Sequence, residues 1–115
     1  MSCPIVFFDF AGSDPEQLAS FYAAVFAWER DATGNLNVPA VSPLPGTLRA
    51  DPPEHRLYIG VADIAASLEA VRAHGGTVEA ERFEVPGVVV LGLFRDPAGN
   101  PMGLVEMDGP QRRIP

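Results

Sequence analysis

The sequence predicts an α+β fold in which two βαβββ modules pair within one domain, residues 1–115. Two observations lead to this fold class. First, a strand-like segment, a capped amphipathic helix and further strand-like segments occur twice, and the acidic residues that open the two helices, Asp14 and Asp63, lie about fifty residues apart. Second, 115 residues with 47% hydrophobic and 20% charged side chains can bury a core without disulfides or structural metals.

The first module is expected over about residues 4–54. Residues 4–10 (PIVFFDF) are rich in aromatic and β-branched side chains and predict a strand. A helix is expected from about 14 to 27, with Ser13 as its N-cap, Glu16 completing a capping box and Pro15 in the first turn. Its apolar face has helical spacing and consists of Leu18, Phe21, Tyr22, Val25 and Phe26. We expect Phe21 and Phe26 to be buried against the sheet.

Residues 28–54 contain most of the ambiguity in this module. Short strands are expected at 28–31 (WERD), 36–41 (LNVPAV) and 45–50 (PGTLRA), with a turn at Gly34-Asn35. The prolines of this region limit strand pairing to sheet edges or irregular pieces, because proline has no backbone N–H to donate.

The second module is expected over about residues 55–107. Residues 56–61 (RLYIGV) predict a strand, and a helix capped by Asp63 follows and ends at Gly75-Gly76. Three further strands are expected at 77–81, 87–95 and 101–107. The segment 96–100 (DPAGN) has the residues of a tight turn before the last of these strands. The tail, 108–115, is expected to be loosely held.

Charge and composition exclude several functions. The chain has 15 Asp and Glu against 8 basic residues, for a net charge of −7, and it contains no lysine. An acidic chain without a basic run is a poor nucleic-acid binder. No apolar run reaches the roughly 20 residues that a membrane span needs, and Cys3 is the single cysteine, so a cytoplasmic location without an internal disulfide is expected. The acidic excess is larger before residue 55, which mildly favours a cationic ligand.

Three segments, taken together and in order, resemble the vicinal oxygen chelate (VOC) superfamily: FYAAVFAWE at 21–29, YIGVADIAASLEAVRAHGG at 58–76 and FRDPAGNPMGLVE at 94–106. This superfamily includes glyoxalase I, extradiol dioxygenases, and fosfomycin- and bleomycin-resistance proteins. The resemblance covers about residues 4–107. It implies the glyoxalase/bleomycin resistance/dihydroxybiphenyl dioxygenase fold, a site in the cleft between the modules, and a homodimer.

The resemblance also implies where a divalent metal would be held, and the residues at those positions cannot hold one. Three of the family's four ligand positions fall on Phe7, Arg56 and Gly103, and none of these side chains coordinates a metal ion. The fourth lies before residue 51, where 32–50 contain no Asp, Glu, His or Cys. His55 and Glu106 lie close by in sequence but on the opposite strand faces. We therefore expect no cofactor, with a divalent metal as the alternative.

Side-chain alternation predicts which residues line the cleft. Phe8 and Phe10 provide apolar surface beneath the first helix, and Leu57 and Ile59 do so beneath the second. The residues between them on each strand must face away from the helices. The predicted ligand-binding residues are Phe7, Asp9, Arg56, Tyr58, Gly103 and Val105. Arg56 either pairs with Asp9 or holds an anionic group.

Three functions remain open. The first is a metal-free homodimer that binds a small molecule, with drug sequestration as one form of that binding, like the bleomycin-resistance proteins. The second is a metal-dependent lyase, isomerase or dioxygenase of the VOC superfamily. The third is an interaction domain with a degenerate cleft. No catalytic residue is predicted: His74 suits the end of the second helix, Trp28 suits core packing, and Cys3 has no histidine near it in sequence.

Overall fold

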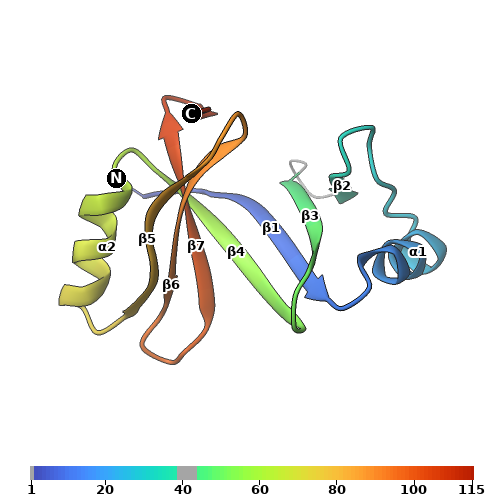
Figure 1. Ribbon diagram of the computed structural model, residues 1–115, viewed down its shortest axis with the longest axis horizontal. Helices are drawn as coiled ribbons and strands as arrows, with labels where there is room; N and C mark the ends of the chain where they lie inside the picture. Colours follow the sequence, from blue (N-terminus) through green and yellow to red (C-terminus); the bar gives the residue numbers. More distant parts are fainter. Residues whose placement is uncertain (1, 39–43) are drawn as a thin grey trace. The chain divides into compact units, whose positions relative to one another are not determined.

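A computed structural model describes residues 2–38 and 44–115 and confirms the α+β class. The helices and strands follow one another along the chain (Figure 1) as β1 (Ile5–Gly12), α1 (Pro15–Phe26), β2 (Leu36–Val38), β3 (Leu44–Ala50), β4 (Glu54–Val61), α2 (Ile64–Ala73), β5 (Thr77–Val85), β6 (Val89–Arg95), β7 (Pro101–Asp108) and β8 (Gln111–Arg112). The chain divides into two compact units. The first unit is residues 7–56, and the second is residues 1–6 together with 57–115.

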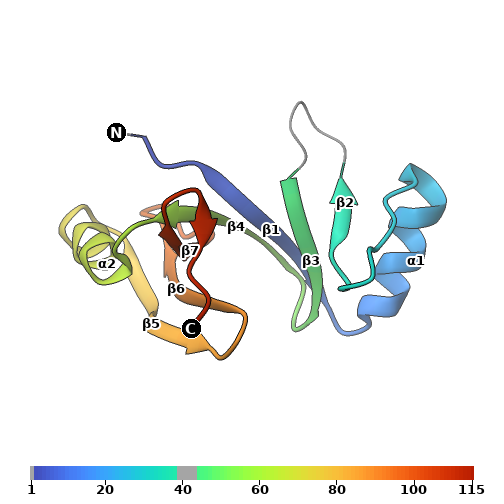
Figure 2. The same cartoon turned by 90° about the horizontal axis from the view of Figure 1, so that it is seen from above.

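In the first unit the strands lie in the order β2-β3-β1, with β3 antiparallel to β2 and parallel to β1. Helix α1 packs against β3 (Figure 2), and the ring of Phe10 lies 5.2 Å from that of Tyr22 on the helix. Phe8 is buried on the same face of β1, with its ring over Gly46 of β3. This confirms that Phe8 and Phe10 lie on the helix side of β1.

Helix α1 begins one residue later than expected. Its N-cap is Asp14, whose carboxylate accepts a hydrogen bond from the backbone N–H of Gln17 at 3.1 Å, with Pro15 at the first helical position. The expectation that Ser13 caps the helix is therefore wrong. Aspartate and serine are comparable N-caps, so the sequence alone does not choose between neighbours.

The expected burial of Phe21 and Phe26 is also wrong. Their exposed fractions are 51% and 55%, and no residue of α1 is fully buried. The apolar stripe of α1 is wider than the surface that β3 and β1 offer, so Tyr22 packs inward while Phe21 lies outward.

Residues 28–54 follow the expectation except at their start, and β3, Leu44–Ala50, lies where a strand was expected at 45–50. The segment 28–31 contributes one isolated bridge, from Arg30 to Leu36, instead of a strand. The expected turn at 34–35 is present, with Gly34 in the left-handed region. β2 covers Leu36–Val38, and the remainder of the expected strand, 39–41, lies outside the described residues.

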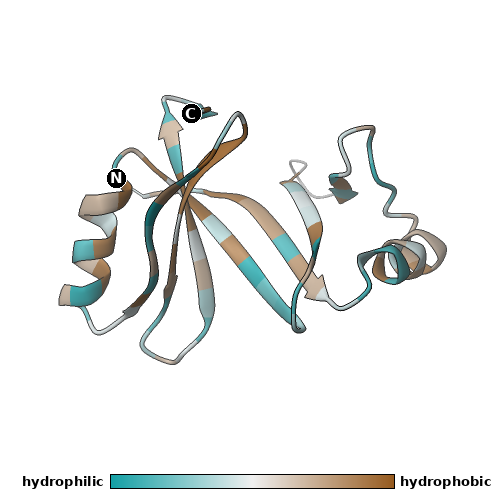
Figure 3. Cartoon of the chain, viewed as in Figure 1, coloured by the Kyte–Doolittle hydropathy of each residue, from teal (hydrophilic) through white to brown (hydrophobic). Residues whose placement is uncertain are grey.

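In the second unit the strands lie in the order β4-β7-β6-β5, and α2 packs on β5, β6 and β7. Asp63 caps α2 as expected, accepting from the backbone N–H of Ala66 at 3.0 Å. The core beneath the helix consists of Ile64, Leu68, Val90, Phe94 and Leu104, with Ile59 and Val61 packed against it. β4 begins with three polar residues, and from Leu57 to Val61 strongly apolar residues alternate with less hydrophobic ones (Figure 3).

One residue of the predicted helix-facing set on β4 departs from this pattern. Leu57 is 40% exposed, so the expectation that it packs beneath the helix is wrong. It pairs with Met102 on β7, and the buried core cluster begins two residues further along β4.

The turn before β7 has the predicted chemistry. The carboxylate of Asp96 accepts hydrogen bonds from the backbone N–H groups of Ala98 and Asn100, at 3.0 and 2.9 Å, and Gly99 adopts a positive φ of 94°. The hydrogen bond from the Asn100 side chain, together with these backbone bonds, holds the pKa of Asp96 below its usual value.

The tail after β7, expected to be loosely held, makes specific contacts within the second unit. β8 pairs antiparallel with β7, and the Arg112 guanidinium donates to the carbonyl of Val88 at 2.9 Å. The backbone N–H of Gly87 donates to the carbonyl of Pro115 at 3.1 Å. Backbone hydrogen bonds that composition does not reveal therefore hold the tail against the β5–β6 hairpin.

Candidate functional site

Each unit has one sheet face covered by its helix and one turned away from it, here called the helix-free face. On the first unit this face carries Asp9 and Arg49, because Asp9 alternates with Phe8 and Phe10 along β1 and pairs in register with Thr47 of β3. On the second unit it carries Tyr58 and Gly103, which pair in register between β4 and β7.

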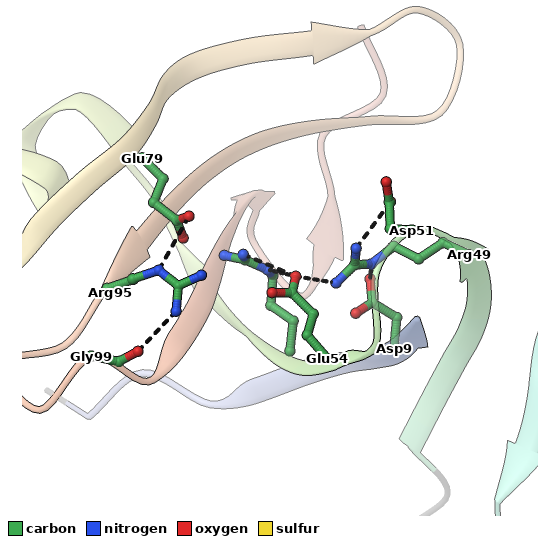
Figure 4. Close-up of polar contacts among 8 residues, drawn as sticks. Asp9, Arg49, Asp51, Glu54, Glu79, Arg95 and Gly99 are labelled. Carbon is green, nitrogen blue, oxygen red and sulfur yellow. Dashed lines mark hydrogen bonds and ion pairs between the residues drawn. The ribbon is translucent and has the colours of Figure 1, made fainter. Parts of the chain in front are cut away.

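Arg49 is the centre of an ion-pair network on the helix-free face of the first unit (Figure 4). Its guanidinium lies 2.9 Å from the carboxylate of Asp9 and 3.0 Å from that of Asp51, and it also pairs with Glu54. The Asp9 side chain is 3% exposed, so its charge depends on this partner rather than on water. The network joins β1, β3 and the start of β4.

Arg56 enters the same network through Glu54. It is 5% exposed, and its Nη2 donates to the Glu54 carboxylate at 3.1 Å. Asp9 and Arg56, both predicted site residues, are thus linked through Arg49 and Glu54. Phe7 lies on the same face of β1 by alternation and is partly buried.

The network shifts the pKa values of its members in opposite directions. Burial alone would lower the pKa of Arg49, but its hydrogen bonds to Asp9, Glu54 and Asp51 outweigh that effect and raise it. For Glu54, burial would raise the pKa, and the bonds from Arg49 and Arg56 lower it below its ordinary value of 4.5. Both Arg49 and Glu54 are therefore charged at neutral pH.

On the second unit the central feature of the helix-free face is the ring of Tyr58. It lies directly over Gly103, where a Cβ atom would be 2.4 Å from the ring. Tyr58 is 6% exposed and Val105 is 5% exposed. Leu91 and Leu93 of β6 pair in register with Val105 and Gly103, so they share this face. The result is an apolar surface with one aromatic side chain.

One charged pair flanks this apolar surface. The Arg95 guanidinium lies 3.3 Å from the Glu79 carboxylate and donates to the carbonyl of Gly99 at 2.9 Å (Figure 4). Both charges are partly exposed, so the pair can exchange with a polar ligand group at small cost.

The residues of these faces do not fit a divalent metal. Phe7, Arg56 and Gly103 supply no ligand atom, and the Tyr58 ring fills the space that a longer side chain at position 103 would need. The carboxylates on the first unit's face, those of Asp9, Asp51 and Glu54, surround the Arg49 guanidinium. Within residues 2–38 and 44–115, no group of three or more His, Cys, Asp or Glu side chains is arranged to hold a metal ion.

The other residues considered from the sequence pack against rings, end a helix or are exposed. The His55 ring packs 4.9 Å from that of Phe10, and Trp28 stacks on Tyr22 at 5.3 Å. His74 is the C-cap residue of α2, and Cys3 is an exposed free cysteine.

Glu106 lies on the helix side of β7, as alternation predicted, and is 6% exposed. Arg82 donates to its carboxylate at 2.7 Å, and Arg113 lies 3.3 Å away. The bonds from Arg82, with a smaller contribution from the backbone N–H of Ile64, outweigh burial and lower the pKa of Glu106 below its ordinary value of 4.5. Its carboxylate joins β5, β7, α2 and the tail.

We expect Glu106→Gln to lower the free energy of unfolding by about 2 kcal/mol at pH 7, because it removes a charged acceptor from a buried pair. A lowered folded-state pKa gives stability that is present above pH 4.5 and is lost as the pH falls through the folded value. The variant should therefore lose less stability between pH 5 and about pH 3.

Urea unfolding as a function of pH checks this prediction. Glu84→Gln is the matched control, because Glu84 is 55% exposed and lies 3.9 Å from the same Arg82. Equal effects of the two substitutions would contradict the role assigned to Glu106.

Three residues of the network, Arg49, Asp51 and Glu54, were missing from the sequence-based site. One signal was available, since Arg49 is the only charged residue between Asp31 and Asp51. That Arg49 pairs with Asp9 could not be found without the parallel pairing of β1 and β3. This pairing places Arg49 opposite Ala11, which lies two residues beyond Asp9 on the same face.

Comparisons with known proteins agree with this architecture. The model of the glyoxalase-like domain family matches residues 5–105. The proteins named "Putative glyoxylase CFP32" from Mycobacterium bovis and Mycobacterium tuberculosis are 28% identical over 111 residues, 84% of this chain. The match spans 42% of their length, less than half of these relatives.

Solved structures of low sequence identity share the fold. A methylmalonyl-CoA epimerase in complex with methylmalonyl-CoA has a TM-score of 0.69 at 17% identity, covering 98% of this chain and all of the other. The methylmalonyl-CoA epimerase of Mycobacterium tuberculosis has a TM-score of 0.59 at 15% identity, covering 90% of this chain and 87% of the other.

The match to the glyoxalase-like domain model, together with the repeated strand–helix–strand pattern, places the chain in the VOC superfamily. Within it, the chain belongs to the glyoxalase-like domain family. No helix of the described residues has the length and apolar character to cross a bilayer.

Proposed function

We propose that the protein is a small-molecule-binding member of the VOC superfamily that works without a metal cofactor, as a cytoplasmic homodimer. The observation that carries the proposal is the Tyr58 ring over Gly103. The ring fills the space beside position 103, where the family resemblance expects a metal ligand. The other two positions, Phe7 and Arg56, offer no ligand atom either.

Each helix-free face, taken by itself, favours one kind of ligand: an apolar one on the second unit and a cationic one on the first. Tyr58 and Leu93 provide flat apolar surface on the second unit. On the first unit, the three carboxylates around Arg49 outnumber the two arginines, which gives that face a net negative charge. Sequestration of a cationic drug requires binding alone, with no reacting group.

A pair of dyes tests the charge preference. We expect the cationic tricyclic dye proflavine to raise the melting temperature progressively as its concentration increases, and the anionic tricyclic dye fluorescein to leave it unchanged. At a ligand concentration of about 100 Kd the stabilisation reaches about 2.7 kcal/mol. Equal shifts with both dyes would contradict the charge preference. Failure of both dyes, and of a wider panel of apolar cations, would contradict the binding proposal and favour an interaction domain.

Elemental analysis of the purified protein tests the absence of a metal. We expect much less than one Zn, Ni, Mn or Fe per chain, and no change in melting temperature or in proflavine binding after dialysis against EDTA. About one metal ion per chain, lost on His55→Ala or Glu106→Gln, would overturn the metal-free proposal in favour of a metal-dependent VOC enzyme.

A further inference from the structure

Helix α1 presents an uncharged apolar face outward, away from the sheet of its own unit. Phe21 and Val25 are 51% and 57% exposed, one helical turn apart. The exposed residues that follow helical spacing on this face are Gln17, Ser20, Phe21, Ala24 and Val25, here called the outward face of α1. Phe21 and Val25, one turn apart, therefore form a small contiguous apolar patch on the exposed side of the helix.

This face is also distinctive in its charge. Residues 17–28 contain no charged side chain, in a chain whose net charge is −7. Glu16, at the start of the helix, is neutralised by Arg30 at 2.8 Å. The outward face of α1 is therefore a neutral apolar surface on a strongly acidic protein.

We infer that the outward face of α1 docks against the same face of a second copy of this chain. Two copies that each carry −7 repel one another over most of their surfaces, and the repulsion is smallest where neither presents a charge. A two-fold contact requires a self-complementary patch. Here the small side chains of Ser20 and Ala24 lie beside Phe21 and Val25, so that the large residues of one helix can fit over the small residues of the other.

The size of the face sets the strength of this contact. A half-exposed phenylalanine offers on the order of 100 Å². The area that the outward face of α1 and its neighbouring residues can bury is therefore smaller than the roughly 800 Å² per partner of a standard interface. We expect a dissociation constant on the order of 10 µM. Because added salt screens the repulsion between the two acidic copies, association should strengthen as salt increases.

This inference deepens the homodimer of the proposed function and rests on it. Sedimentation velocity over protein concentrations from about 1 to 300 µM, which bracket the expected dissociation constant, tests it. Val25→Glu places a like charge at the centre of the contact, at a position exposed enough to leave the fold intact. We expect it to abolish dimers at the highest concentration. Ala70→Glu, on the exposed side of α2, is the matched control and should leave dimerisation unchanged.

A charge-complementation arm separates an interface from a structural effect. Val25→Lys alone should also weaken self-association, and an equal mixture of the Val25→Glu and Val25→Lys proteins should form dimers again. Circular dichroism melting of each variant verifies folding.

The outcomes are distinguishable. A wild-type protein that stays monomeric throughout overturns both this inference and the proposed homodimer, while dye binding still tests ligand recognition by itself. A dimer that persists in Val25→Glu overturns this inference alone and leaves the homodimer on another surface. Loss of dimers in Ala70→Glu as well would show a general charge effect and also overturns the assignment to α1.

Discussion

Replacing Arg49 with methionine is expected to lower the free energy of unfolding by about 3 kcal/mol, close to the cost of breaking a buried ion pair. Methionine has a similar volume but no charge, so the 3%-exposed carboxylate of Asp9 would lose a cation 2.9 Å away. Asp51 and Glu54 are more exposed and contribute less to the loss. Urea unfolding measures the effect directly.

Arg30→Met is the matched control for this prediction. Arg30 also forms an ion pair within the first unit, but its partner Glu16 is 82% exposed. We expect a cost below about 1 kcal/mol there. In the Asp9→Asn background, Arg49→Met should become much less costly, because the buried charge that Arg49 neutralises is then absent. Equal costs for Arg49 and Arg30 would refute the central role of Arg49.

Gly103→Ala is expected to lower the free energy of unfolding by about 2–3 kcal/mol, because an added methyl group would meet the Tyr58 ring at 2.4 Å. The ring is 6% exposed and cannot move aside without disturbing its neighbours. The substitution should also weaken proflavine binding, since it moves the aromatic side chain of the helix-free face. Thermal melting and dye titration measure the two effects.

A second glycine and a double-mutant cycle control this prediction. At Gly12 an added Cβ would lie 3.1 Å from the tip of the flexible Leu18 side chain, so Gly12→Ala should cost less. In a Tyr58→Leu background the cost of Gly103→Ala should fall by more than about 1 kcal/mol. An unchanged cost would mean that another neighbour causes the strain.

Much of the fold could be predicted because its signals are local. Asp63 caps α2, and the residues of the turn at 96–100 specify its hydrogen bonds, whatever the rest of the chain does. Alternation along β1 placed Phe10 beneath α1 and Asp9 on the opposite face. The resemblance to the VOC superfamily is confirmed by the match to residues 5–105.

The features that could not be predicted depend on contacts between distant segments. The partners of Arg49 follow from the parallel pairing of β1 and β3, which leaves no periodic mark in the sequence. The position of the tail depends on its hydrogen bonds to Val88 and Gly87, which are distant in the sequence. The exposure of Phe21 depends on how much of an apolar stripe the neighbouring sheet can cover, which helical spacing does not specify.

The boundary between the two compact units has a consequence for anyone who divides this protein. Residues 1–6 belong to the second unit, where the carbonyl of Pro4 accepts from the backbone N–H of Gly60 at 2.9 Å, although the chain then continues through the first unit. A recombinant fragment that begins at Leu57 would therefore lack a native segment, however carefully its end is chosen. A split version of the protein would need that hexapeptide returned as a separate synthetic piece, or joined by a new linker in a circular permutant.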